Sequence, residues 1–384
     1  MNTRLQRVIF FYMNTRRLFS AVTLLLVITF VISAESAAGI ISYLEGSVQV
    51  SRNGSYISPR NVDIGLKIEA SDTIETGPDG YAEVEMNAPS AGSIVKVRSN
   101  SSFYFESSPE GAPRRETIFQ MLRGALSLKV GRLSSRESYK VQTDSAVMAV
   151  RGTEFNVDMS ADRSVLVTVP EGHVESKSGR TTIMAQPGTV AAVDNNAQIS
   201  SIKIAPEDIN LYRQYWQGLR LDALKINAKL SIQQFSRQWD QQLPRLESAM
   251  AELKSQQSVI SHWEQIVQGN VNIPPTADII RDKRALSPGM LELRAILPVA
   301  ERTFNTLLGL EEAYNQGFAD GPFQSGNYRN AADFYSSFSG DKEEVRDMLA
   351  RARYLMRVYS VLDGSAGGGM PSSNAPDIMS TPSF

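Results

Sequence analysis

Apolar and polar residues alternate in the middle of the chain with a period of two. The alternation is clearest from Phe155 to Met159 and from Val165 to Val169. Period two predicts strands with one buried face. Turn-forming residues interrupt the pattern at 161–163 and 170–172. Gly152 lies within the pattern, and a glycine there indicates a bulge or a close approach of two backbone segments.

The same pattern extends over residues 39–205. Short strand-like runs are separated by turn residues every eight to twelve residues or so. Asn53-Gly54 predicts a two-residue hairpin turn, because both residue types tolerate positive φ. Regular strand spacing without a helical pattern predicts an all-β domain. Periodicity alone leaves a sandwich, a barrel and a β-roll open.

A helical pattern begins at Pro206, which acidic residues follow, as is typical of a helix start. From Leu221 to Val267 apolar residues recur every three or four positions, which predicts a long helix. Pro244 is expected to kink or restart it. Ser287-Pro288 predicts the opening of a second helix over 288–316, with another kink at Pro298.

Further helices are predicted at 327–338 and 341–362, so residues 206–363 form an elongated helical hairpin or bundle. The fold class is therefore α+β multidomain. Aromatic residues lie on or near the helical stripe. We interpret them as bundle core, and the alternative is a groove that faces a partner. The aromatic residues that would face such a partner are Tyr212, Trp216, Trp239 and Trp263.

The first 38 residues have the pattern of a secretory signal peptide. Residues 18–32 are almost wholly apolar, Arg16-Arg17 precede them, and small residues follow. Met13 repeats the Met-Asn-Thr-Arg of the first residues and is an alternative start. An uncleaved anchor is the other interpretation, although a membrane span needs about 20 apolar residues. We expect cleavage and a periplasmic location.

The amino-acid composition excludes several kinds of binding site and cofactor. The chain has 384 residues, 42% of them hydrophobic, which is enough for two domains with their own cores. Its net charge is −2, and no basic footprint for nucleic acid is present. It has no cysteine, which excludes disulfides, thiolate zinc sites and iron–sulfur clusters. Residues 364–384 are rich in Gly, Ser, Pro and Asn, which predicts a disordered tail.

Few residues are candidates for catalysis or metal binding. Glu83 and Glu85 are two apart on one strand face, as paired carboxylates could be, but alternation already explains them as a solvated face. His173 has no second histidine nearby, whereas a metal site needs three or four converging ligands. No phosphate-binding loop is present. We therefore expect no cofactor, no metal site and no catalytic residues.

Several short motifs occur in a specific order. They are Asp72–Gly77 with Ala82–Glu85, then Leu122–Leu126, then two later motifs. In this order and spacing they resemble the FecR domain, a periplasmic β-domain of diderm bacteria, over about 39–205. The resemblance therefore implies a FecR-like sandwich or β-roll. The most recognisable residues, with a structural or an interaction role, are Val150, Arg151, Gly152, Thr153, Glu154, Phe155, Glu171 and Gly172.

Arg151 is the charged residue of this motif that the pattern singles out. It stands at an otherwise apolar strand end beside a glycine. We interpret its guanidinium as a cap for carbonyls or as a partner of Glu154 or Glu171. The alternative is direct contact with a ligand.

The resemblance implies recognition of proteins or surfaces and not catalysis. The best-known members are inner-membrane regulators of iron uptake with a long cytoplasmic segment. Here only about 17 residues precede the apolar run, too few for such a domain. The leading hypothesis is an exported, non-enzymatic scaffold or adaptor that binds envelope or periplasmic proteins, or a second copy of itself. We expect no nucleic-acid partner, and membrane contact only through an uncleaved signal segment.

Two alternatives stay open. The chain could be a FecR-type signalling protein that senses an envelope or outer-membrane ligand. A cell-wall-associated enzyme is the third hypothesis, although no acid–base or nucleophile constellation supports it.

Overall fold

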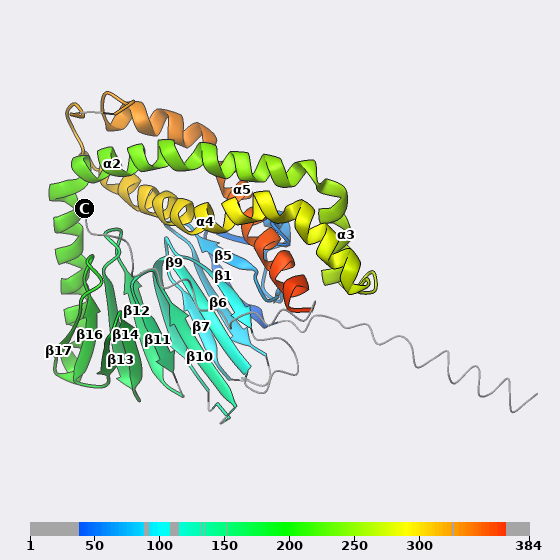
Figure 1. Cartoon of the computed structure of the whole chain (residues 1–384). Helices are drawn as coiled ribbons and strands as arrows, with labels where there is room; N and C mark the ends of the chain where they lie inside the picture. Colours follow the sequence, from blue (N-terminus) through cyan, green and yellow to red (C-terminus); the bar gives the residue numbers. More distant parts are fainter. Residues whose placement is uncertain are drawn as a thin grey trace, which may run out of the picture.

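The computed structural model describes residues 38–87, 92–107, 115–131, 133–134, 136–150, 152–324 and 326–365. The predicted signal peptide, Arg151 and almost all of the predicted tail lie outside these residues. Strands occupy the first half of the described chain and helices the second (Figure 1), which confirms the α+β class.

Seventeen strands form two sheets that share β9 (Arg115–Lys129). The first sheet has the order β4-β1-β6-β7-β9-β12-β13-β16-β17, and the second has the order β3-β2-β5-β8-β9-β10-β11-β14-β15. The other strands of the first sheet are β1 (Gly39–Glu45), β4 (Lys67–Ile68), β6 (Tyr81–Met86), β7 (Ile94–Val97), β12 (Glu154–Met159), β13 (Val165–Glu171), β16 (Thr189–Val193) and β17 (Ile199–Lys203). Those of the second are β2 (Val48–Arg52), β3 (Ser55–Tyr56), β5 (Thr73–Thr76), β8 (Ser102–Ser107), β10 (Glu137–Gln142), β11 (Val147–Val150), β14 (Val174–Ser178) and β15 (Thr181–Ala185).

One hydrophobic core fills the space between the two sheets. It takes Ile41 and Phe155 from the first sheet and Phe103 and Met148 from the second. Most strands therefore contribute one apolar face, as the period-two pattern predicts. The sheets form a sandwich.

Strand β9 passes from one sheet to the other at Gly124. Before this residue it pairs with β8 and β10 of the second sheet, and from it onward with β12 and β7 of the first. Gly124 has φ +89°, and a side chain there would overlap the backbone of Ser101. The Ser101 hydroxyl accepts a hydrogen bond from the Ala125 N–H at 2.8 Å. Glycine is required at this corner because other residues rarely adopt its backbone conformation.

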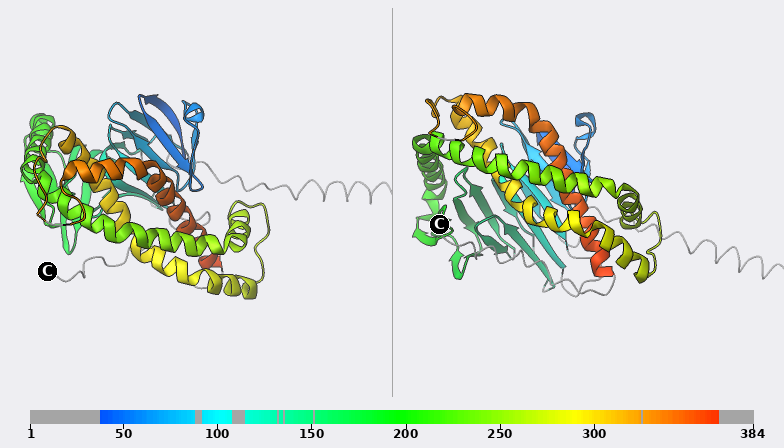
Figure 2. Two further views of the ribbon diagram at one scale, coloured as in Figure 1. Left: turned by 90° about the horizontal axis from the view of Figure 1, so that it is seen from above. Right: turned by 45° about the horizontal axis from the view of Figure 1, so that its top comes forward.

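The second half of the chain consists of long helices. They are α2 (Ile209–Ser255), α3 (Gln257–Val267), α4 (Thr276–Asn315) and α5 (Ala331–Ser365), and short 3-10 turns lie at Pro59–Asn61 and Pro206–Asp208. The first part of α2 lies beside β16 and β17, then the helix bends and runs along α4, while α5 crosses obliquely (Figures 1 and 2). The helices enclose a second hydrophobic core. No helix of the described residues is long and apolar enough to cross a membrane.

The predicted helix start at Pro288 was wrong, and the helix does not restart at Pro244. Helix α4 starts at Thr276 and continues through Pro288 and Pro298, and α2 continues through Pro244. Buried residues lie on both sides of Pro288, and Gly289 sits so close to α2 that an added Cβ would lie 2.8 Å from Cγ of Leu253. Packing against α2 therefore carries the helix through a residue that lacks an N–H.

The two predicted C-terminal helices are one helix, α5. Gly340 lies inside this helix, and a glycine there would destabilise an isolated helix. An added Cβ would meet no atom within 4 Å, so no close contact requires a glycine at this position. Phe338 and Val345 are buried in the same core on either side of it. They are two turns apart, so the buried face continues and keeps the helix intact.

Candidate functional site

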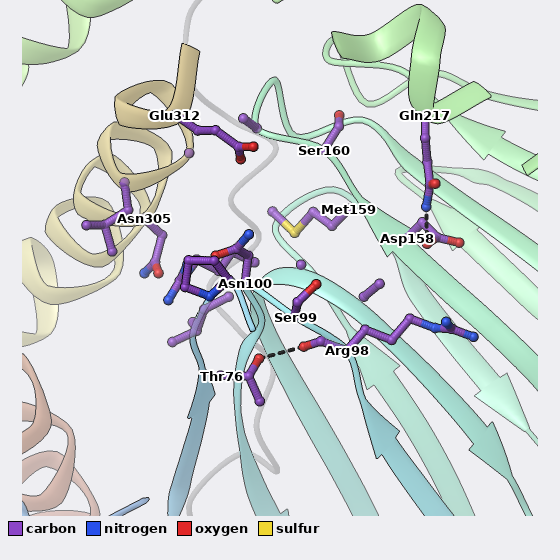
Figure 3. Close-up of a pocket in the computed structure, with 18 of the residues that line it drawn as sticks. Thr76, Arg98, Ser99, Asn100, Asp158, Met159, Ser160, Gln217, Asn305 and Glu312 are labelled. Carbon is purple, nitrogen blue, oxygen red and sulfur yellow. Dashed lines mark hydrogen bonds between the residues drawn. The ribbon is translucent and has the colours of Figure 1, made fainter. Parts of the chain in front are cut away.

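A cleft of about 1300 Å³ lies where strand ends of the sandwich face the helices. Figure 3 shows Asn305 and Glu312 of α4 on one side and Gln217 of α2 on the other, with Asn100 and Ser160 from strand connections between them. The cleft is therefore lined jointly by both halves of the chain.

A buried ion pair fixes α2 to the first sheet at one wall of the cleft. Arg213 donates to Asp158 of β12 through Nε and through Nη2, the latter at 2.7 Å. Gln217 donates to the same carboxylate at 2.9 Å. Next to this pair, Trp216 packs on Leu166 and completes a small apolar contact with the sandwich. A two-pronged arginine–carboxylate contact also sets the orientation of the helix.

A second group of charges connects β5 and β9 to α5 at the cleft. Glu75 of β5 is 3.9 Å from Nη2 of Arg123 on β9 and 3.9 Å from Nε of Arg346 on α5. The Tyr56 hydroxyl donates to Glu75 at 2.8 Å. Nη1 of Arg346 also donates to the exposed Glu343 at 3.0 Å. The Nε atoms of Arg123 and Arg346 are buried without any hydrogen-bond partner.

Further buried charges join α4 and α5 to the second sheet. Arg353 donates to Glu301 at 2.5 Å and lies over the ring of Tyr104 on β8. Burial raises the pKa of Glu301, and the charge of Arg353 partly offsets this rise. Arg302 of α4 is 2.9 Å from Asp144 in the β10–β11 turn. The contact between the helices and this sheet is thus largely polar.

The charges that line the cleft are unbalanced. Seven basic side chains stand against four acidic ones, a surplus of three positive charges in a chain whose net charge is −2. Of these, Arg163 makes no ion pair with any residue that the structure describes. The basic residues are Arg98, Arg123, Arg163, Arg213, Arg220, Lys342 and Arg346, and the acidic ones are Glu75, Asp158, Glu311 and Glu312.

None of the described motif residues lines the cleft, and the buried ones pack at neighbouring strand ends. Val150, Thr153 and Phe155 are buried. Gly172 has φ +85°, and a Cβ there would lie 2.5 Å from Cγ2 of Thr153. Gly152, with φ +64°, turns the chain into β12. The two motifs therefore pack directly against each other at neighbouring strand ends. A side chain at Gly172 would push these strand ends apart.

The two glutamates of this motif are exposed. Glu154 and Glu171 are register partners on β12 and β13. Neither makes an ion pair within the part of the chain that the structure describes. Arg151, the expected partner, lies outside that part.

The proposed partner-facing aromatics need correction. Trp239 and Trp263 are buried in the helical core, and Trp216 is buried against the sandwich. The indole N–H of Trp263 donates to Asp282 at 3.2 Å. Only Tyr212 is half-buried, at the rim of the Trp216 contact. The chain's own side chains cover the three tryptophan rings, but only Trp239 and Trp263 lie in the helical core, as the core interpretation predicts.

The other chemical candidates are isolated. Glu83 accepts a hydrogen bond from the Tyr81 hydroxyl at 2.5 Å and lies 3.2 Å from Lys96, and the Tyr81 contact in particular lowers its pKa. Glu85 and His173 are exposed. In the described residues no cluster of three or more His, Asp or Glu is placed to hold a metal ion.

The charged cleft is the feature that sequence patterns missed. Its central residues were nevertheless inside the recognised segments. Glu75 lies in Asp72–Gly77, and Arg123 lies in Leu122–Leu126. Glu75 stands on a strand that is otherwise buried, and Arg123 follows the buried Phe119 and Met121 of β9, so a charge at a strand position next to buried residues is the signal that could have revealed them.

The family comparison identifies the central part of the sandwich. Residues 72–175 match the family model described as FecR protein. The chain contains a FecR domain. The matched segment runs from the start of β5 into β14 and carries Glu75, Arg123 and Asp158 of the cleft. The flanking strands on both sides complete the two sheets around this FecR domain.

No curated protein matches this chain in sequence. Two crystal structures of a "putative anti-sigma factor" from Parabacteroides distasonis ATCC 8503 are similar to part of it, with 20% identity and a TM-score of 0.31. The similarity covers 37% of this chain and 64% of that protein, which is less than two thirds of its length.

Proposed function

We propose that this chain is an exported, non-enzymatic interaction protein of the cell envelope, a scaffold or adaptor. Its FecR domain and its helices bind a partner protein together, in the cleft between them. The observation that carries the proposal is the joint construction of this cleft, whose α2 wall is fixed by the buried Arg213–Asp158 pair. A site whose walls are already ordered binds at a lower entropic cost.

The side chains at the cleft support recognition. Arginines and amides are the most numerous polar side chains of its lining, and these groups bind carboxylates and peptide backbone through directed hydrogen bonds. Asp158 and Glu311 are held in ion pairs with Arg213 and Lys342. The two histidines of the chain, His173 and His262, are not among the cleft residues.

Export follows from the pattern of the first 38 residues and is part of the proposal. Cell fractionation and the intact mass of the purified chain test it. We expect a periplasmic chain that lacks these residues. A chain of full mass in the cytoplasm would contradict the export.

Site-specific crosslinking in living cells tests the binding role. A photoreactive residue is placed at Asn100 or Asn305 in the cleft, and at exposed Thr182 on β15 as the control. We expect one discrete partner adduct from both cleft positions and none from Thr182. The same adduct at all three positions, or adducts only outside the cleft, would contradict a partner in the cleft.

The alternative is a FecR-type signalling or regulatory protein, which the match over 72–175 favours. The two functions differ in what deletion of the gene does. A regulator predicts altered transcription of a target gene. A scaffold predicts loss of an envelope assembly while transcription is unchanged.

A further inference from the structure

We infer that the partner segment that enters the cleft is acidic, and that its carboxylates bind the arginines of both walls. This inference rests on the proposed function and specifies the chemistry of the partner. It depends on three features: the charge surplus of the cleft, the unsatisfied Arg123 and Arg346, and the polar groups that line the rest of it.

The charge surplus is local and runs against the charge of the chain. The cleft has three more basic than acidic side chains, although the whole chain is slightly acidic. Positive charges gathered in a concave site focus the field and attract an anionic segment. Arg163 adds a further positive charge: burial lowers the pKa of its guanidinium and the charge of Arg302 lowers it further, while the charges of Asp144 and Asp162 raise it only in part and form no ion pair with it in the described chain. A carboxylate beside it would restore the balance.

Arg123 and Arg346 form the most specific part of the site. They come from β9 and α5 and share Glu75 only at a distance of 3.9 Å. The Nε–H of each is buried without an acceptor. Buried donors without a partner are uncommon in folded proteins and often mark the place of an ion or a ligand. A ligand carboxylate can accept from both guanidinium groups, which neither Glu75 nor Glu343 does here.

The remaining lining suits an extended peptide. The volume of about 1300 Å³ exceeds that of typical small-molecule pockets, roughly 300–1,000 Å³. The unpaired amides among its lining residues offer both donors and acceptors, as a peptide backbone requires. Their side chains make no hydrogen bond to the described part of the chain, and they are Gln49, Asn100, Asn210, Gln214 and Asn315.

A matched pair of peptides tests the inference on the purified mature chain. One is a fluorescein-labelled ten-residue peptide of alternating Asp and Gly, and the other has Asn in place of Asp. We expect the Asp peptide to bind at least tenfold more tightly by fluorescence anisotropy at low salt, and the difference to shrink at high salt. Equal binding of the two peptides, or binding of neither, would overturn the inference.

Charge variants test whether the cleft is the site. Arg346→Gln is expected to weaken binding of the Asp peptide roughly tenfold, because a charge-assisted hydrogen bond is lost. Arg180→Gln, in the exposed β14–β15 turn, removes the same charge and should leave binding unchanged. Arg98→Gln, at an exposed cleft position, is a second cleft variant, and it removes only the hydrogen bonds of 3.3 and 3.4 Å from Arg98 to Ser127. Equal effects of the cleft variants and Arg180→Gln would overturn the assignment.

Two competitors test the class of ligand. Pyrophosphate and an oligogalacturonate are added to the complex of the Asp peptide. Displacement only at much higher concentration than unlabelled Asp peptide supports an acidic protein segment. Tighter binding of either competitor, with the same dependence on Arg346, would overturn the peptide assignment in favour of a phosphate or an acidic glycan.

The inference and the proposed function can fail separately. A partner crosslinked at Asn100 and Asn305 whose captured segment is not acidic would refute the inference and leave the binding role intact. Adducts confined to positions outside the cleft would refute the binding role itself.

Discussion

The sandwich and the helical region are each closed by apolar packing, but they meet across a mainly polar boundary. The sandwich core and the helical core contain no common residue. Between them lie ion pairs such as Arg213–Asp158 and Arg302–Asp144, with one small apolar contact around Trp216. Charged contacts orient the helices without merging the cores.

The difference shows why the cleft lies at the boundary. Apolar packing has no direction and fills the available space, so each core is closed. Each ion pair connects the sandwich and the helices at one place only. The space that remains between these places is the cleft in Figure 3. The boundary is therefore where a ligand can contact both regions, and where charge changes should act on their relative position.

The largest expected effect is on the cores. Phe155→Ala removes a fully buried side chain from the sandwich and should lower the free energy of unfolding by roughly 3–5 kcal/mol. Phe304→Ala, beside Trp239, is the matched change in the helical core. Hydrogen exchange with mass spectrometry reports the two regions separately. We expect each variant to lose protection mainly in its own region.

Equal loss of protection in both regions for either variant would contradict separate cores. Tryptophan fluorescence gives a second measure, because all three tryptophans lie on α2 and α3. The Phe155→Ala variant should therefore change strand protection more than it changes this signal.

The next effect concerns a buried ion pair between α4 and α5, which lies at the boundary because Arg353 stands over the ring of Tyr104 on β8. Glu301→Gln leaves Arg353 buried without its charge partner and should cost roughly 3–5 kcal/mol of unfolding free energy. Glu292→Gln breaks the exposed pair of Glu292 with Arg245 between α2 and α4 and should cost at most about 1 kcal/mol. Denaturant unfolding of the two variants checks this. If the two variants had similar denaturant midpoints, the buried pair of Glu301 with Arg353 would contribute no more to stability than the exposed pair of Glu292 with Arg245.

Two glycines sharpen the comparison of the two regions. Gly124→Ala meets the backbone of Ser101 and has φ +89°, so we expect a loss of more than about 1 kcal/mol. Gly218→Ala lies within α2 with nothing within 4 Å of an added Cβ, and should stabilise by roughly 0.5–1 kcal/mol. Thermal unfolding measures both. A destabilised Gly218→Ala would show that the first part of α2 needs its flexibility.

The smallest effect is a pH dependence. Burial raises the pKa of Glu106 on β8, and Gln120 and Arg357 partly offset it. The folded chain therefore holds this proton to a higher pH than the unfolded chain does. Its contribution to stability is present below the ordinary glutamate pKa, about 4.3, and is lost as the pH rises through the raised value. The side chain of the Glu106→Gln variant does not titrate. As the pH rises through the raised pKa of Glu106, the variant should therefore become more stable relative to the wild type.

Melting temperatures of both chains from pH 4 to pH 7 check this prediction. Curves that stay parallel would mean that the carboxyl of Glu106 does not titrate differently in the folded and unfolded chains.

Local pattern was sufficient for much of the fold. The period-two alternation predicted the strands around Phe155 and Val167, and the three-to-four spacing predicted the helices after Pro206. Both depend on the side-chain geometry of a few neighbouring residues, which the sequence contains in full. The turn-forming residues at 170–172 likewise indicated the turn between β13 and β14, where Gly172 has φ +85°.

Tertiary packing decided the rest. Helix α4 runs through Pro288 because α2 packs against it, and three tryptophans are buried because distant residues cover them. The contact of Glu75 with both Arg123 and Arg346 joins three elements far apart in the chain. No local period records such a contact, because its energy depends on the distance and burial of charges that only the folded chain brings together.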